Sequence, residues 1–323
     1  MTTSSPGPAG KIRRADLPRE PISRRWTAGE GRDFGATGSN APEPIRALDQ
    51  RCQRHETPCG QGTVVWRSWG SGRPLLLLHG SHGSWMHWVH NIAALAGSHQ
   101  VLVPDMPGYG ESAAPADVES PESHAEALAV GLWRLLPRRV PVDVVGFSLG
   151  ALIGAHLAWL APQLIRRLVI VDAGGLNTPM PMVHLQLKSL RGLQGEQLLS
   201  ARRHNLHTMM IHDPERIDDV ALWIDANTPR PRTRVHYKVI PDKLLLALRR
   251  LPIQVDAIWG ANDRPHPDPE ANAAALRQIQ PGAELRTVPR AGHWSMFEGA
   301  VDFNRHLIEL LAMPLRASAK DDE

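Results

Sequence analysis

The chain has 323 residues and a small formal charge of +3, from 36 Lys and Arg against 33 Asp and Glu. The basic residues are spread along the whole sequence, which argues against a dedicated nucleic-acid surface. The two cysteines, Cys52 and Cys59, cannot build a disulfide framework or a four-ligand zinc site, while 42% hydrophobic residues suffice for a substantial core.

The first 50 residues contain few aliphatic side chains and show neither a helical nor a strand period. We therefore expect residues 1–50 to form a disordered or loosely docked arm. The start of the chain lacks the apolar core of a secretory signal, and no stretch of about 18 uncharged apolar residues occurs anywhere. These features predict a cytoplasmic protein without a membrane span, and leave both a monomer and a homo-oligomer open.

From residue 51 onward, short apolar runs alternate with helical patterns, as in a parallel sheet with crossover helices. Residues 63–69 follow a turn-like segment and predict an antiparallel hairpin at one edge of the sheet. The expected parallel strands are 75–78, 100–104, 142–145, 168–171, 255–259 and 284–288. The expected helices are 85–95, 123–136, 149–160, 269–279 and 296–311. The pattern predicts an α/β fold with a mostly parallel, doubly wound sheet.

Residues 175–250 interrupt the alternation, because helical signals dominate there and no apolar strand appears. Asp213-Pro214-Glu215 predicts a helix start, with an N-cap acid followed by proline at the first helical position. We expect this segment to form a helical lid inserted before the penultimate strand, between two core segments at 51–174 and 251–323.

Gly146-Phe147-Ser148-Leu149-Gly150 lies between an apolar strand and a helical run, which is the context of a nucleophile elbow. The flanking glycines would let the strand and the helix approach, while the strained turn lifts the Ser148 hydroxyl above the sheet. The backbone N–H of Leu149 would then face an oxyanion at the helix N-terminus. Ser148 is therefore the candidate nucleophile, and an ordinary glycine-rich turn is the alternative.

A serine nucleophile needs a histidine to accept its proton and an acid to orient that histidine. Of the sixteen histidines, His293 is the expected base, because it follows the last strand and returns to the edge where Ser148 lies. Asp263, in the loop after 255–259, is the expected acid. Asp172, at the end of 168–171, is the alternative acid.

The loop after the first parallel strand, residues 78–83, is rich in glycine and small polar residues. The backbone N–H of Ser81 is the expected second oxyanion donor, and His79 is expected to make a structural hydrogen bond beneath it. Three histidines in this region are of the metal-ligand type but have no carboxylate partner nearby: His82, His87 and His90. No metal or cofactor is implied, because side chains and backbone supply every step of such a mechanism.

These motifs resemble the α/β-hydrolase superfamily over about residues 60–312, through His79-Gly80, residues 105–112, the elbow, Gly260 to Asp263 and Gly292-His293. The resemblance implies the α/β-hydrolase fold. Within it, Gly292-His293-Trp294 and the following Phe297-Glu298 look like the meta-cleavage product hydrolases, which split carbon-carbon bonds in ring-fission products. Those enzymes hold the substrate carboxylate with a lid arginine, which implies this role for Arg230 or Arg232.

Two reactions on a small-molecule substrate remain open. The first is hydrolysis of a carboxylic ester of a small or medium, apolar or aromatic compound through an acyl-enzyme. The second is cleavage of a carbon-carbon bond in a vinylogous diketone by the same triad. The resembling carbon-carbon hydrolases tend to have asparagine where Phe147 stands, which favours the ester. Lactone hydrolysis, perhydrolase activity, acyl transfer and a non-enzymatic binding protein are further alternatives, and substrate contacts are expected from Phe147, Trp294 and Arg230.

Overall fold

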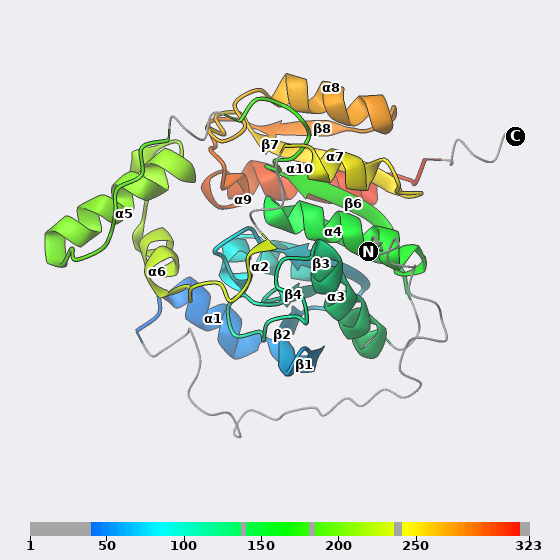
Figure 1. The fold of residues 1–323 in the computed structure, drawn as a ribbon, viewed down its shortest axis with the longest axis horizontal. Coiled ribbons are helices and arrows are strands. Elements are labelled where there is room, and N and C mark those ends of the chain that lie inside the picture. The colour runs from blue at the N-terminus through cyan, green and yellow to red at the C-terminus, as the bar shows by residue number, and fades with distance from the viewer. Residues whose placement is uncertain (1–39, 137–139, 181–184, 236–240, 317–323) are drawn as a thin grey trace, which may run out of the picture.

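A computed structural model describes residues 40–136, 140–180, 185–235 and 241–316. An eight-stranded sheet with the order β1-β2-β4-β3-β5-β6-β7-β8 forms the centre of the molecule (Figure 1). Strands β1 (Gln53–Cys59) and β2 (Gly62–Trp69) form the antiparallel hairpin expected at one edge, and β2 also runs antiparallel to β4 (His99–Pro104). The other neighbours pair in parallel: β3 (Arg73–Leu78), β5 (Val142–Phe147), β6 (Ile165–Val171), β7 (Gln254–Gly260) and β8 (Leu285–Val288).

Two hydrophobic cores lie on opposite faces of the sheet, because successive side chains of a strand point to opposite sides. In β3, Leu76 and Leu78 belong to the core under α3 (Pro121–Leu135) and α4 (Leu149–Leu160). Leu75 and Leu77 belong to the second core. Burial on both faces explains why the strands are continuous apolar runs. The chain has the α/β-hydrolase fold, as the sequence predicts.

Five further helices cover the two faces of the sheet among the described residues. The first core also contains residues of α7 (Lys243–Leu248) and α8 (Pro269–Ile279). The second core contains residues of α2 (Ile92–Ala96), α9 (Ser295–Glu298) and α10 (Ala300–Ala312). This arrangement leaves the carboxyl ends of the parallel strands as the place where the loops of the candidate site gather.

Two predicted helices are interrupted. The helix expected at 85–95 consists of a 3-10 helix η1 (Trp85–Trp88) and α2, with Asn91 between them. The Asn91 amide donates to the Met296 carbonyl at 2.9 Å, so this residue fastens a loop rather than continuing a helix. The helix expected at 296–311 breaks at Gly299, where a Cβ atom would lie 2.3 Å from the Val288 side chain.

The expectation of an unstructured or loosely docked arm is wrong for residues 43–50. Helix α1 (Glu43–Arg51) packs on the sheet through the fully buried Ile45, and Asp49 accepts a hydrogen bond from Arg67 Nε at 2.8 Å. The partly buried Leu48 packs against the same core as Ile45, but two large aliphatic side chains in nine residues are too few for hydrophobic periodicity to predict a helix. Residues 1–39 lie outside the described residues. Cys52, at the end of α1, and Cys59 carry free thiols.

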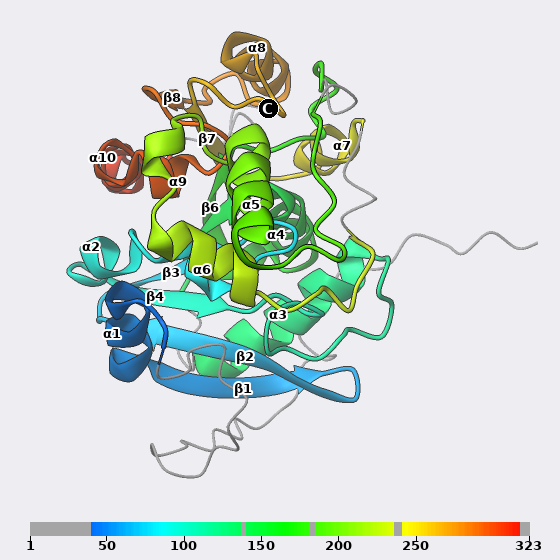
Figure 2. The same cartoon turned by 90° about the vertical axis from the view of Figure 1, so that its left-hand side faces the viewer.

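A helical insertion leaves the sheet after β6 and returns at β7. It contains α5 (Gly195–Met209), a 3-10 helix η4 (Pro214–Arg216), α6 (Asp219–Asn227) and α7. Helices α5 and α6 stand together on one side of the molecule (Figure 2). The Asp213 carboxylate caps η4 by accepting from Glu215 N–H at 3.0 Å, so the predicted helix start becomes one short turn. Within the described segments, no helix combines the length and apolar character needed to cross a membrane.

Candidate active site

Ser148 stands in the tight turn that joins β5 to α4. Its backbone has φ 51° and ψ −115°, a conformation that is strained for a residue with a side chain. The Ser148 N–H donates to the Val171 carbonyl at 2.8 Å, which ties the turn to the end of β6. A Cβ atom on Gly146 would lie 2.4 Å from the Gly150 carbonyl oxygen, so only glycine allows this approach of strand and helix. The turn therefore presents Ser148 at the carboxyl end of β5.

His293 and Asp263 meet beside this turn, although 30 residues separate them in sequence. His293 Nδ1 lies 3.0 Å from Asp263 Oδ2, and both side chains are buried. Asp263 follows β7, while His293 lies between β8 and α9. Ser148 and His293 line the same cavity. The carboxyl ends of three strands thus bring a hydroxyl, an imidazole and a carboxylate to one place.

The electrostatics of the pair favour a charged carboxylate and a basic imidazole. Burial of the His293 ring opposes its protonated form, but the charge and hydrogen bond of Asp263, together with Asp172, outweigh burial and raise the pKa of His293 above its ordinary value. Burial likewise opposes ionisation of Asp263, yet His293 and His266 hold the pKa of this carboxyl below its usual range. An imidazole in this environment can accept a proton from a neighbouring hydroxyl and be stabilised as the cation.

Asp172, the alternative acid, serves a different purpose. Its Oδ1 accepts from Gly260 N–H at 2.6 Å, and its Oδ2 accepts from the Ser295 hydroxyl at 2.5 Å. Gly260 begins the loop that carries Asp263, and Ser295 lies two residues after His293. Burial, and then the charge of Asp263, raise the pKa of Asp172 well above its ordinary value. Asp172 therefore joins the two loops, and the carboxylate on the His293 ring is that of Asp263.

The loop after β3 lies against the elbow. His79 is fully buried, with Nδ1 2.8 Å from the Gly80 carbonyl and Nε2 accepting from Met106 N–H at 2.9 Å. Burial lowers the pKa of His79 to about 4, so the ring is a neutral structural link, as the sequence predicts. Ser81 lines the cavity, and Leu149 is the first residue of α4 and therefore lies at its N-terminus.

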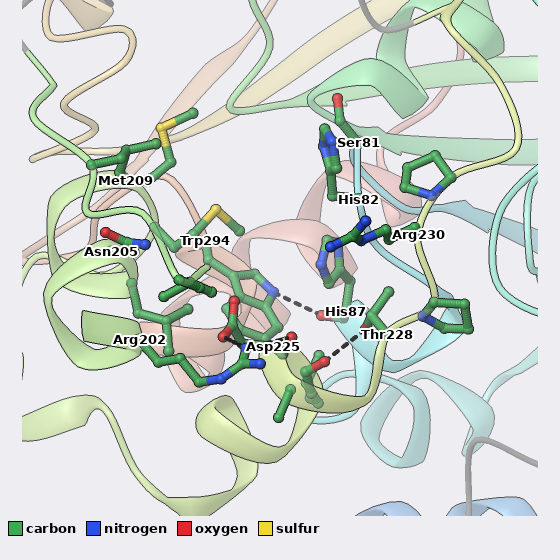
Figure 3. A pocket seen from close by; sticks show the side chains of 18 of the residues that line it. Ser81, His82, His87, Arg202, Asn205, Met209, Asp225, Thr228, Arg230 and Trp294 are labelled. Atoms are coloured by element: carbon green, nitrogen blue, oxygen red, sulfur yellow. Dashed lines mark hydrogen bonds and ion pairs between the residues drawn. The ribbon is translucent and has the colours of Figure 1, made fainter. Parts of the chain in front are cut away.

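Ser148 lines a cavity of about 1330 Å³. Figure 3 shows other side chains that line this cavity. The body of the protein contributes the wall nearest the serine: Ser81, His82, His87, Phe147, His293 and Trp294. The rest of the wall comes from residues 187–231 of the insertion, among them Leu206, Met209, Met210 and Ile224. Arg202 of α5 and Asp225 of α6 form an ion pair in this wall, which ties the two helices together. The insertion therefore covers the candidate site.

A profile of the alpha/beta hydrolase family matches residues 75–305, more than half of the chain. The chain belongs to the alpha/beta hydrolase family. It is similar to the 2-hydroxy-6-oxo-6-phenylhexa-2,4-dienoate hydrolase of Burkholderia cepacia, with 27% identity over 265 residues that cover 75% of this chain and 89% of that protein.

Two solved structures show the same fold. A meta-cleavage product hydrolase from Pseudomonas fluorescens gives a TM-score of 0.61 at 22% identity, covering 77% of this chain and 94% of that one. The naproxen esterase of Bacillus subtilis gives a TM-score of 0.69 at 17% identity, covering 88% and 100%. This protein is an alpha/beta hydrolase enzyme whose relatives include carbon-carbon hydrolases and esterases alike.

In this alpha/beta hydrolase, the two arginines considered for substrate contact have different surroundings. Arg230 lines the cavity and points into it on the side of His82 and His87 (Figure 3). Arg232 instead donates to the carbonyl groups of Gly110, at 3.0 Å, and Ser112. Arg232 therefore fastens the loop after β4. Phe147 and Trp294 line the cavity, and the Trp294 ring stacks on Phe297 with centroids 4.2 Å apart.

Two buried residues beside the site of this hydrolase, His266 and Glu298, were not predicted from the sequence as functional side chains. His266 donates from Nδ1 to Asp263 Oδ2 at 3.0 Å and from its backbone N–H to Oδ1 at 3.1 Å. The only sequence signal for His266 is its spacing of three residues from Asp263. Glu298 accepts backbone N–H groups from His212, Asp213 and Gly292 at 2.7–2.8 Å, and so joins the insertion to the loop of His293.

Asp263, His266 and His293 bring three ligand-type atoms within 4.8 Å of one another in the described part of this hydrolase. The nitrogen that faces Asp263 in each ring carries the proton of a hydrogen bond, and a metal ion would have to displace both protons. The arrangement is therefore that of a hydrogen-bonded carboxylate with two histidines.

Proposed function

We propose that the protein is a serine hydrolase that cleaves a carboxylic ester of a small or medium, apolar or aromatic compound. The contact that carries this proposal is the 3.0 Å hydrogen bond between His293 Nδ1 and Asp263 Oδ2, with His293 and Ser148 lining one cavity. Ser148 is the nucleophile, His293 the general base and Asp263 the acid that orients the ring.

In the first half of the reaction, Ser148 Oγ attacks the ester carbonyl while His293 Nε2 takes the hydroxyl proton. The backbone N–H groups of Ser81 and Leu149 stabilise the oxyanion. The C–O bond then breaks, and His293 returns the proton to the departing alcohol. In the second half, a water molecule gives a proton to His293 Nε2 and attacks the acyl carbonyl. The bond to Ser148 Oγ then breaks, His293 returns the proton to Oγ, and the acid is released.

The lining of the cavity supports an apolar acyl or aromatic substrate. Phe147, Trp294, Met209 and Met210 supply apolar surface, and methionine adapts to irregular ligands. The exposed Arg230 offers a positive charge for a carboxylate at the far side of the substrate. The insertion acts as the lid that excludes water over this surface.

The second candidate reaction is cleavage of a carbon-carbon bond in a vinylogous diketone from aromatic degradation. Two observations favour it: the similarity to a phenylhexadienoate hydrolase, and the placement of Arg230 and His87 on one cavity, where they could bind a dienoate. Phe147 favours the ester, because it places an apolar ring where a carbanion would need a polar group.

The test compares wild type, Ser148→Ala and the matched control Ser189→Ala, whose serine lines the same cavity away from the triad. Each protein is mixed with p-nitrophenyl esters of graded acyl length and with a 2-hydroxy-6-oxo-dienoate, and absorbance is followed. Ester turnover that disappears only in Ser148→Ala supports the proposal. Rapid loss of dienoate absorbance with poor ester cleavage selects the second reaction, and activity that survives in Ser148→Ala rejects both.

A further inference from the structure

His266 makes an unusual contact with the carboxylate that orients the candidate base. Its Nδ1 and the Nδ1 of His293 both lie 3.0 Å from the same atom, Asp263 Oδ2. The two rings lie 5.1 Å apart between centroids. One carboxylate oxygen therefore accepts hydrogen bonds from two imidazoles.

The surroundings of His266 determine which nitrogen carries its proton. The side chain is buried, and Nε2 has no hydrogen-bond partner among the described residues. This atom faces the backbone at Gly174, where a Cβ atom would lie 2.8 Å from it. A proton on Nε2 would be a buried donor without an acceptor, which is costly. Burial also lowers the pKa of His266 below its ordinary value. The ring is therefore neutral, with its proton on Nδ1 and directed at Asp263.

The backbone holds His266 in this place. Pro265 and Pro267 flank it and fix their own φ angles, so the loop has little freedom to carry the ring away. The His266 N–H also donates to Asp263 Oδ1 at 3.1 Å, so the residue contacts both carboxylate oxygens. Two of the three hydrogen bonds between Asp263 and these histidines thus come from His266.

We propose that His266 is a positioning residue that shares the carboxylate of Asp263 with His293 and thereby limits how strongly Asp263 holds the catalytic ring. This inference rests on the proposed roles of Ser148, Asp263 and His293. A carboxylate with two N–H donors on one oxygen offers each of them less negative charge than it would offer one donor. Without the His266 N–H, the bond from His293 to Asp263 strengthens and His293 becomes more basic.

Other titratable groups face the same ring and must stay unchanged in a test. Four titratable groups surround the His293 ring. Asp263 and His266 come from the loop after β7, Asp172 comes from the end of β6, and His87 comes from η1. His266 faces Asp263 and His293. A substitution at 266 therefore changes one member of this group and leaves the rest in place.

The experiment uses a matched pair of variants. His266→Leu fills the site but has no N–H, whereas His266→Asn places a side-chain NH₂ where the wild-type ring has Nδ1. We expect the acid limb of kcat/KM to move up by about half a pH unit in His266→Leu and to stay at the wild-type position in His266→Asn. A limb that does not rise in the Leu variant, or that rises equally in both, overturns the proposal.

Nitrogen NMR of histidine-labelled wild type gives a second measurement that needs no activity. The His266 signals are identified by their loss in His266→Asn. A neutral ring protonated on Nδ1 supports the proposal, and a proton on Nε2 overturns it. These spectra also decide the matter if His266→Leu does not fold. If Ser148→Ala keeps full activity, the proposed function fails, while the spectra still test the shared carboxylate.

Discussion

The carboxyl group of Asp172 accepts a hydrogen bond from the hydroxyl of Ser295, 123 residues further along the chain. The same carboxyl accepts from Gly260 N–H, and Val171 beside it accepts from Ser148 N–H. The end of β6 therefore contacts all three loops that carry the proposed triad. The geometry of the site depends on this strand end as much as on the three side chains.

Asp172→Asn should stabilise the protein increasingly as pH rises. In the unfolded chain this carboxyl ionises near 3.8, but burial keeps it protonated to higher pH in the folded state. The folded state then binds more protons, so wild-type stability falls as pH increases above that value. Asparagine has the same shape but does not ionise, so the stability of the variant does not fall with pH for this reason. We expect the melting temperature of the variant to exceed that of wild type by about 2 °C or more at pH 8 and to match it near pH 4. A difference that is independent of pH would contradict the assignment.

The pH dependence of kcat/KM should report His293. The proposed base must be neutral, and Asp263 raises its pKa above 6.5, so activity should fall with decreasing pH through a midpoint above that value. Asp263→Asn should lower kcat by about 10³–10⁴-fold and move the midpoint down. Steady-state rates from pH 5 to 9 check both, with Asp268→Asn as the control, because Asp268 caps α8 from the solvent-exposed side.

Glu298→Gln should weaken the junction between the insertion and the His293 loop. The carbonyl oxygen of glutamine can replace one oxygen of the carboxylate. Its NH₂ group takes the place of the other oxygen and cannot accept a hydrogen bond from the backbone N–H there. We therefore expect a loss of about 1–3 kcal/mol in the free energy of unfolding, measured in urea. Faster cleavage of residues 185–235 by a protease should accompany it. Glu309→Gln is the matched control, because its half-exposed carboxylate should contribute below about 0.5 kcal/mol. Equal losses in the two variants would refute this role.

Gly146→Ala should destabilise the elbow by about 3 kcal/mol or more, because its Cβ would lie 2.4 Å from the Gly150 carbonyl oxygen. Gly97→Ala is the control, since its Cβ would have no neighbour closer than 3.7 Å and its φ of −64° suits alanine. Thermal unfolding of the two variants measures the contrast. A Gly146→Ala protein as stable as Gly97→Ala would mean that the turn is looser than described.

The sequence predicted the sheet and the elbow because both depend on strong local patterns. Strands buried on both faces are continuous apolar runs, and the strained Ser148 turn requires glycine at 146 and 150. Residues at the ends of such strands could be placed at one edge without knowing any side-chain contact. This reasoning selected Ser148, Asp263 and His293, and their catalytic roles stay predictions.

Features held by single polar contacts could not be predicted in this way. Helix α1 is fastened in part by the ion pair of Asp49 and Arg67, and nothing in the local sequence of either residue indicates the other. Arg230 and Arg232 differ by two positions in a proline-rich segment, yet only the fold around Gly110 shows which of them fastens a loop. His266 was overlooked because its role depends on a carboxylate that already had an expected partner.

Helix α5 has 15 residues, of which two, Ala201 and Leu206, are buried. Most of its surface is therefore under little constraint from packing, while the strand ends that hold the proposed triad lie in the two cores. Evolution could exchange the side chains of this helix at small cost to folding. A lineage could thus acquire new substrates by altering one wall of the cavity, and inherit the reacting groups unchanged.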